Sequence, residues 1–105
     1  MSEFIKVAKA ADIPDPGRLV LEVDDNLVLL LHVGGDFFCI DDVCTHDGDT
    51  LSEGELEDHA IACPRHGAKF DIRSGEALTM PATEDTRRHD VKVENGDVYI
   101  RLNES

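Results

Sequence analysis

Hydrophobic and polar residues alternate in short runs along most of this chain, and a two-residue period is typical of half-buried β-strands. Eight apolar or β-branched runs lie at 4–8, 19–23, 27–33, 37–40, 60–62, 69–72, 91–93 and 98–100. No segment keeps a helical period for more than two turns. Short strands that recur without helices between them predict an all-β fold, an antiparallel β-sandwich or barrel.

Turn residues separate these runs where antiparallel strands have to reverse. Asp24-Asp25-Asn26 lies between the second and third runs, and Gly34-Gly35 lies between the third and fourth. Glu94-Asn95-Gly96-Asp97 joins the last two runs and predicts a type I′ turn, because Asn and Gly tolerate a positive φ. Arg73-Ser74-Gly75-Glu76 marks one more turn. The sequence therefore predicts several β-hairpins.

The length of 105 residues suits one domain that buries roughly two thirds of its unfolded surface, so we expect a single domain over 1–105. The first residues lack the basic start and apolar run of a signal peptide, and no stretch approaches the roughly 20 apolar residues of a membrane span. Three cysteines do not pair evenly in disulfides. These features predict a soluble, cytoplasmic protein without a membrane partner.

Charge narrows the class of partner. Ten Lys and Arg residues stand against 23 Asp and Glu residues, which gives a formal net charge of −13. This charge argues against nucleic acid and favours a basic protein surface. Residues 41–58 contain eight acids and no Lys or Arg. Taken alone, such a run is typical of a solvated face.

Two short Cys/His pairs carry the candidate chemistry. Cys44-Thr45-His46 is separated by sixteen residues from Cys63-Pro64-Arg65-His66, and each pair follows a predicted strand. Two thiolates and two imidazoles can hold a pair of irons, one by Cys and the other by His. The same ligands could hold one zinc, although zinc sites of this composition usually combine a Cys-x-x-Cys knuckle with a separate His pair. A visible absorption spectrum separates the two, because zinc protein is colourless.

The two boxes, Cys44-Thr45-His46-Asp47-Gly48 and Cys63-Pro64-Arg65-His66-Gly67, resemble the signature boxes of the Rieske [2Fe–2S] proteins. The resemblance implies three stacked antiparallel sheets and a cluster-binding subdomain of two loops, at about residues 41–82. It also implies that Cys44 and Cys63 hold a buried iron and that His46 and His66 hold an outer one. Pro81 would close the third side of the cluster.

The neighbours of these ligands indicate a low reduction potential. High-potential Rieske proteins carry a further disulfide and a Ser and a Tyr that donate hydrogen bonds to the cluster sulfurs. This chain has Asp49, Arg65, Ala68 and Phe70 at those positions. Fewer donors leave the reduced cluster less stabilised, so we expect a midpoint at the low end of the Rieske range, about −150 mV.

The resemblance implies a single-electron carrier, the ferredoxin of a multicomponent ring-hydroxylating system. Its partners would be a flavin-dependent reductase and a terminal oxygenase, bound transiently by a monomer. We expect no enzyme activity. Protein side chains would fill all four ligand positions and leave no open iron site for oxygen. The sequence also has no nucleotide-binding fingerprint and no nucleophile–base pair. The alternative is an accessory Rieske subunit of a larger reductase, such as the small subunit of a nitrite reductase.

Other candidate ligands are weaker. Cys39 lies between Phe38 and Ile40 in a strand pattern, which predicts a buried, inert thiol. His32, His59 and His89 lack partner ligands in the sequence and are interpreted as ordinary core or surface residues.

Overall fold

The computed structural model describes residues 3–42, 51–63, 68–78 and 85–103. Most of this part of the chain is β-strand, as the alternation predicts. The elements are β1 (Ile5–Lys9), the 3₁₀ turn η1 (Ala10–Asp12), β2 (Gly17–Val23), β3 (Asn26–Val33), β4 (Asp36–Asp41), β5 (Leu56–Glu57), β6 (Ala60–Ala62), β7 (Lys69–Asp71), β8 (Arg88–Glu94) and β9 (Asp97–Arg101). Within these ranges no helix is long and apolar enough to cross a membrane.

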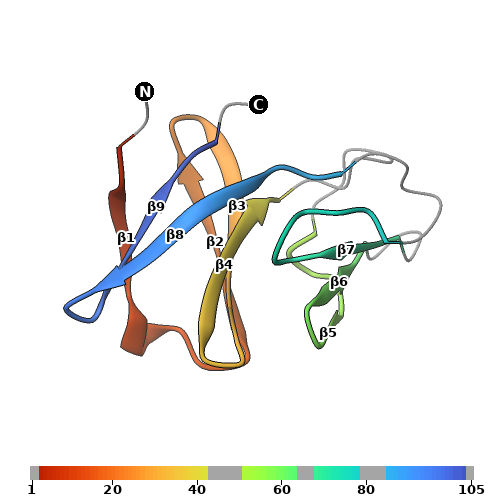
Figure 1. Ribbon diagram of the computed structural model, residues 1–105, viewed down its shortest axis with the longest axis horizontal. Coiled ribbons are helices and arrows are strands. Elements are labelled where there is room, and N and C mark those ends of the chain that lie inside the picture. The colour runs from red at the N-terminus through yellow and green to blue at the C-terminus, as the bar shows by residue number, and fades with distance from the viewer. Residues whose placement is uncertain (1–2, 43–50, 64–67, 79–84, 104–105) are drawn as a thin grey trace.

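The strands form two antiparallel sheets (Figure 1). The large sheet has six strands in the order β1-β9-β8-β4-β3-β2, and the small sheet has the order β5-β6-β7. In the described part of the chain, the two halves of the large sheet are joined by a short pairing, in which Cys39 and Ile40 of β4 face His89 and Arg88 of β8. The three sheets implied by the resemblance are therefore recognisable, with two of them joined through this short pairing.

The hairpin turns have the backbone that their residues predict. Asn95 and Gly96 have φ values of 53° and 81°, and the two glycines Gly34 and Gly35 have 63° and 87°. Positive φ at both central positions is the mark of a type I′ turn, whose twist matches that of the strands. Asp24 and Asp25 also have positive φ, at 49° and 66°. The predicted reversals between these strands are confirmed.

Alternation along β3 and β4 gives the large sheet a core on each face. Leu29, Leu31 and Ile40 point to the small sheet and pack with Ile61 and Phe70, among other residues. Val28, Leu30 and Cys39 point the other way and pack with Val98 and Ile100 of β9. Since side chains of a strand alternate between faces, one pair of strands supports both cores. The small sheet thus lies against β3 and β4.

Candidate metal centre

Of the four predicted ligands, the structure describes Cys63. Cys44, His46 and His66 lie outside the described residues, as do Asp49, Arg65 and Pro81. The described residues do, however, include those that flank each box segment, and these flanking residues show how the chain is held on either side of the boxes. Here the first box segment is 43–50 and the second is 64–67.

Cys63 is a free thiol that is 1% exposed, directly after β6. Its backbone N–H donates to the carbonyl oxygen of Ala68 at 2.6 Å, across the second box segment. Ala68 is fully buried, and β7 begins at the next residue. The strands β6 and β7 and this bond therefore fix both ends of the second box.

Asp42 fixes the ends of the first box. The side-chain carboxylate accepts a hydrogen bond from the N–H of Leu51 at 2.8 Å, and the backbone N–H of Asp42 donates to the Leu27 carbonyl at 3.0 Å. Asp42 is 1% exposed and Leu51 is fully buried. The sequence interpretation, which treated the acidic run as solvated, missed this role. The available signal was an Asp at the end of an apolar strand, where a short side chain can bond a nearby N–H.

The segment 79–84, which contains Pro81, is also closed at its base. Ala77 donates its N–H to the Asp85 carboxylate at 2.9 Å, and Thr86 donates its N–H to the carbonyl of Gly75 at 2.8 Å. Gly75 lies so close to Thr86 that an added Cβ would come 2.0 Å from its carbonyl oxygen. Only glycine fits this approach, which pairs the turn after β7 with the chain entering β8.

The ends of the two boxes meet in one core. Leu51, Cys63 and Ala68 belong to the same buried cluster as Leu29 and Phe70. The boxes are far apart in sequence, but their ends converge on the face of β3 that carries the small sheet. Rigid strands can therefore aim both box segments at a common centre.

A second polar group lies at the end of β4. The Nε2 atom of His89 lies 2.7 Å from the carboxylate of Asp41, and the Nδ1 atom accepts the backbone N–H of Asn103 at 3.0 Å. Because Nδ1 accepts, the ring proton is on Nε2 and is donated to Asp41. Arg87 also donates to Asp41, from Nε at 3.1 Å. His89 is thus a satisfied core histidine, as its lack of partner ligands in the sequence suggested.

These contacts set the charge state of Asp41. Desolvation alone would raise the pKa of this carboxyl group, but the hydrogen bonds from His89 and Arg87 outweigh it and hold the pKa below its usual value. Asp41 therefore stays ionised beside the chain that enters the first box.

A family model for the Rieske [2Fe-2S] domain matches residues 3–95. The chain belongs to this family. Relatives named as the ferredoxin subunit of 3-phenylpropionate/cinnamic acid dioxygenase support the assignment along the whole length. The relative from Photorhabdus laumondii is 39% identical over 99 residues, with 93% of each chain covered. The relative from Escherichia coli K12 is 39% identical over 102 residues, with 96% of this chain and 95% of the relative covered.

Solved Rieske structures have the same fold. The ferredoxin of carbazole 1,9a-dioxygenase from Nocardioides aromaticivorans superposes with a TM-score of 0.91 at 24% identity, covering 95% of this chain and 98% of that one. A ferredoxin in a complex of reduced oxygenase and oxidised ferredoxin, again of carbazole 1,9a-dioxygenase, has a TM-score of 0.89 at 30% identity, with 97% of each chain covered. The all-β Rieske fold expected from the two boxes is confirmed.

The cofactor of this Rieske domain is one [2Fe–2S] cluster, as the family implies, and the described residues fit it. Cys63 offers a buried, unpaired thiol, the ligand that iron–sulfur clusters use. Ala68 and Phe70, which are both fully buried, surround the end of the second box with hydrocarbon. Within the described ranges no three His, Cys, Asp or Glu side chains gather to hold a metal ion, and three of the predicted ligands lie outside those ranges.

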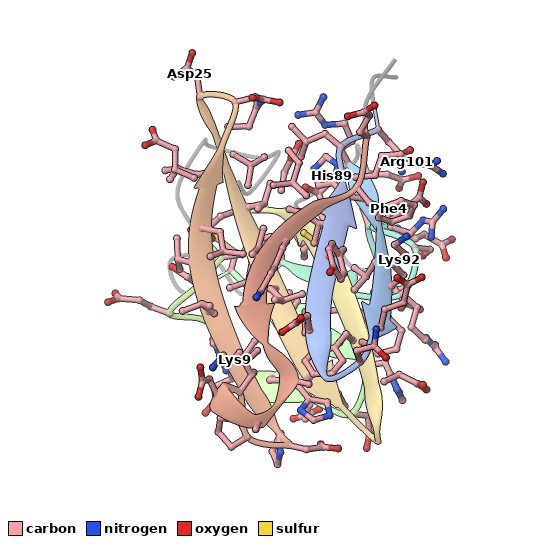
Figure 2. The ribbon with its side chains drawn as sticks, turned by 90° about the vertical axis from the view of Figure 1, so that its left-hand side faces the viewer. Phe4, Lys9, Asp25, His89, Lys92 and Arg101 are labelled. Atoms are coloured by element: carbon pink, nitrogen blue, oxygen red, sulfur yellow. The ribbon has the colours of Figure 1, made fainter. Side chains whose placement is uncertain are left out.

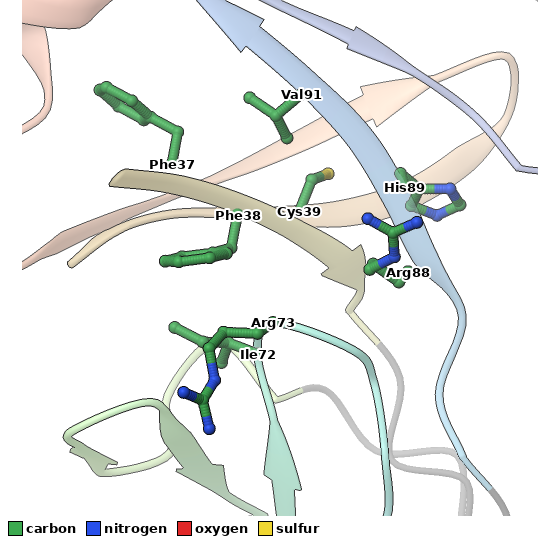
Figure 3. Close-up of a pocket in the computed structure, with 8 residues that line it drawn as sticks. All are labelled: Phe37, Phe38, Cys39, Ile72, Arg73, Arg88, His89 and Val91. Carbon is green, nitrogen blue, oxygen red and sulfur yellow. The ribbon is translucent and has the colours of Figure 1, made fainter. Parts of the chain in front are cut away.

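Cys39 differs from Cys63 although both are buried. Figure 3 shows Cys39 and Phe38 on opposite faces of β4, and Cys39 packs into the core on the far face from the small sheet. Desolvation, with a smaller contribution from Asp41, raises the pKa of the Cys39 thiol to about 12. A thiol with this pKa stays protonated at neutral pH, and the expected inert role is consistent with the structure.

Proposed function

We propose that this chain is the ferredoxin component of a multicomponent ring-hydroxylating dioxygenase. It carries single electrons from a flavin-dependent reductase to a terminal oxygenase. Cys44 and Cys63 bind one iron of the cluster, and His46 and His66 bind the other. The chain acts as a monomer in the cytoplasm, as a single domain of residues 1–105 whose cluster-binding part spans about 41–82.

One observation carries this proposal: the relatives that match nearly the whole chain at 39% identity are named as ferredoxin subunits of a dioxygenase, not as catalytic subunits. The described site is compatible with this role. Cys63 is buried at the end of a strand, and both box segments end in the same core. The related ferredoxin that was solved with its oxygenase supports docking of the same kind for this chain.

The bound cluster supplies one-electron redox chemistry. The residues of the chain supply the surroundings. Burial of Cys63 keeps water from its sulfur, and the bonds from Leu51 to Asp42 and from Cys63 to Ala68 hold the box segments at both ends. A rigid site changes little between oxidation states, which favours fast transfer. Ala68 and Phe70 offer no side-chain hydrogen-bond donor, in keeping with a low potential.

The two buried cysteines give the ligand assignment a matched test. Purified Cys63→Ser protein should lose the visible absorption of the cluster and the electron paramagnetic resonance signal that appears on one-electron reduction. Cys39→Ser should keep both, because Cys39 packs on the other face of β4. A colourless parent protein with one tightly bound zinc would contradict the cluster assignment. A fully loaded Cys63→Ser variant would contradict the ligand set.

Partner transfer tests the carrier role. Reduced protein, mixed in a stopped-flow instrument with the terminal oxygenase of a ring-hydroxylating dioxygenase, should be oxidised in a second-order reaction. A flavin-dependent ferredoxin reductase of such a system should reduce it again. Co-elution of the chain with one large reductase subunit through every purification step would instead favour the accessory-subunit alternative.

A further inference from the structure

Arg18 joins the edge of the large sheet to the segment that follows the first box. Its Nη1 atom lies 2.8 Å from the carbonyl oxygen of Ser52 and 2.6 Å from that of Gly54. Nη1 carries two N–H groups, so one guanidinium nitrogen can serve both carbonyls. These contacts connect residues that are 34 and 36 positions apart in the chain. They are long-range bonds from β2 of the large sheet to the turn that precedes β5.

The segment held by Arg18 touches both boxes. Leu51 begins it, and the Leu51 N–H is bound by Asp42 at the end of β4. Gly54 closes it by donating its N–H to the Leu51 carbonyl at 3.0 Å. A Cβ on Gly54 would come 1.7 Å from the carbonyl oxygen of Ala62, the residue before Cys63. The turn 51–54 thus ends one box and supports the start of the other.

The backbone at Arg18 is fixed by its neighbours. Gly17, the preceding residue, packs against Pro14, so that an added Cβ would come 2.3 Å from the Pro14 carbonyl oxygen. Arg18 is paired with Leu31 of β3, which is fully buried in the core under the small sheet. Its backbone is therefore set by a close approach on one side and by a core strand on the other.

Arg18 also brings a positive charge to an acidic part of the chain. Residues 41–58 contain eight acids and no Lys or Arg, so their segment has no cation of its own. Arg87 supplies one to Asp41, and Arg18 brings another to the turn 51–54. A charged donor gives stronger hydrogen bonds to carbonyls than a neutral donor does.

We propose that Arg18 is a positioning residue for the [2Fe–2S] cluster. By holding two carbonyls of the turn 51–54, it fixes the chain between Leu51, which follows the first box segment, and Cys63, where the second box begins. The inference rests on the proposed ligand set. Arg18 lies outside both boxes, on the edge strand β2 of the large sheet, so no box motif includes it.

Iron release from the oxidised holoprotein to a chelator tests this role. Arg18→Met should release iron about tenfold faster than the parent protein, because the turn loses two charge-assisted bonds. Arg18→Lys keeps the charge and a donor but not the planar guanidinium, so its rate should fall between those two. The visible circular dichroism of the cluster should change in Arg18→Met before any iron is lost.

Arg101→Met is the matched control. Arg101 lies on β9, four strands from β2 in the large sheet, and bonds to Asp90 with a side chain that is 44% exposed. Figure 2 shows it beside Phe4, over whose ring its guanidinium lies at 4.7 Å. The control removes the same charge and a comparable contact, and its release rate should equal that of the parent.

Hydrogen exchange on the holoproteins separates positioning from general stability. In Arg18→Met, exchange should speed up at the amides of Gly54 and Ala62 and stay unchanged in β3. A parent-like release rate for Arg18→Met, an equal acceleration in Arg101→Met, or faster exchange spread evenly over both sheets would each overturn the inference. Absence of a cluster from the parent itself would overturn the proposed function, and this inference with it.

Discussion

Asp41 shows how much a single side chain contributes to this site. Its carboxylate accepts bonds from His89 and Arg87 of the C-terminal part, at 2.7 and 3.1 Å. The next residue is Asp42, which holds the end of the first box. Ionised Asp41 therefore links β4, β8 and the chain that enters the metal centre. Its side chain is 21% exposed, so these bonds are partly shielded from water.

The lowered pKa of Asp41 predicts a pH-dependent stability. A carboxyl group with a depressed folded-state pKa stabilises the fold above its unfolded pKa, near 3.9, and loses that contribution as the pH falls through the folded value. Asp41→Asn should lower the free energy of unfolding by about 2 kcal/mol at pH 7. The difference from the parent should shrink below about pH 4. Urea unfolding followed by far-UV circular dichroism at several pH values measures both.

Asp36→Asn is the control for this prediction, because Asp36 is exposed at the start of the same strand. It should have little effect at any of these pH values. A deficit of Asp41→Asn that stayed constant from pH 7 to pH 3 would show that ionisation of Asp41 is not its source.

Phe70 and Ala68 set the expectation for the potential. Both are fully buried near the end of the second box and lack a donor. Phe70→Tyr adds a hydroxyl group at the position where high-potential Rieske proteins carry a Tyr. One new hydrogen bond to a charged acceptor is worth about 1.5 kcal/mol, so the midpoint should rise by roughly 60 mV for one electron. Redox titration measures the shift.

Phe37→Tyr is the control, since Phe37 packs against the core on the opposite face of the large sheet. It should leave the midpoint unchanged. The parent should titrate near the low end of the Rieske range, about −150 mV, and a parent midpoint above roughly +100 mV would sink the argument from missing donors.

At the scale of elements, Gly54 makes a very close backbone contact between the turn 51–54 and strand β6 of the small sheet. No side chain fits there, because a Cβ would come 1.7 Å from the Ala62 carbonyl oxygen. Gly54→Ala should therefore displace the turn 51–54 from β6 and speed up loss of the cluster. Gly96→Ala has open space around its Cβ and meets only the strain of a φ of 81°. We expect about 1 kcal/mol of destabilisation from Gly96→Ala, because a residue with a Cβ is strained in the left-handed region, with normal cluster retention.

Cluster content after dialysis and the midpoint of thermal unfolding distinguish the two glycine variants. If Gly96→Ala lost its cluster as fast as Gly54→Ala, the close contact with Ala62 would not be the cause.

The elements also show what the sequence could predict. The long strands and the type I′ turns follow from local patterns, whereas the ligand set stays a prediction from the boxes, since only Cys63 lies among the described residues. The two-residue strand β5, Leu56–Glu57, was missed because it has no alternation of its own and exists only by pairing with β6. The strand β8 begins at Arg88, three residues before the predicted run, because pairing with β4 and β9 extends it through polar residues. Asp42 and Arg18 act through partners that no local pattern shows.

At the scale of the whole molecule, the main feature for the approach of partners is the formal net charge of −13. Several basic side chains form ion pairs with acids of the same chain. These pairs include Lys6–Asp97, Arg73–Asp71, Arg87–Asp41 and Arg101–Asp90. Because acids outnumber bases, a negative electrostatic field extends from the protein into the solvent. Such a field speeds the approach of a basic surface and slows that of an acidic one.

Electron exchange with the proposed partners should therefore depend on salt. The second-order rate constant for reduction by the proposed flavin-dependent reductase should fall roughly fivefold between low and physiological ionic strength, because screening weakens the long-range attraction. Stopped-flow mixing across a salt series measures this. Glu53→Gln together with Glu55→Gln should reduce both the rate at low salt and the slope. A rate constant independent of salt would refute electrostatic steering by this charge.

The small sheet consists of strands of two and three residues, and part of its core comes from Leu29, Leu31 and Ile40 of the large sheet. The large sheet has a second core on its far face. Strands this short do not fold alone. We therefore expect an order of folding. The six-stranded sheet should form first, and the small sheet should then form on its surface. Insertion of the cluster would come last, because Cys63, one of its proposed ligands, directly follows strand β6 of the small sheet.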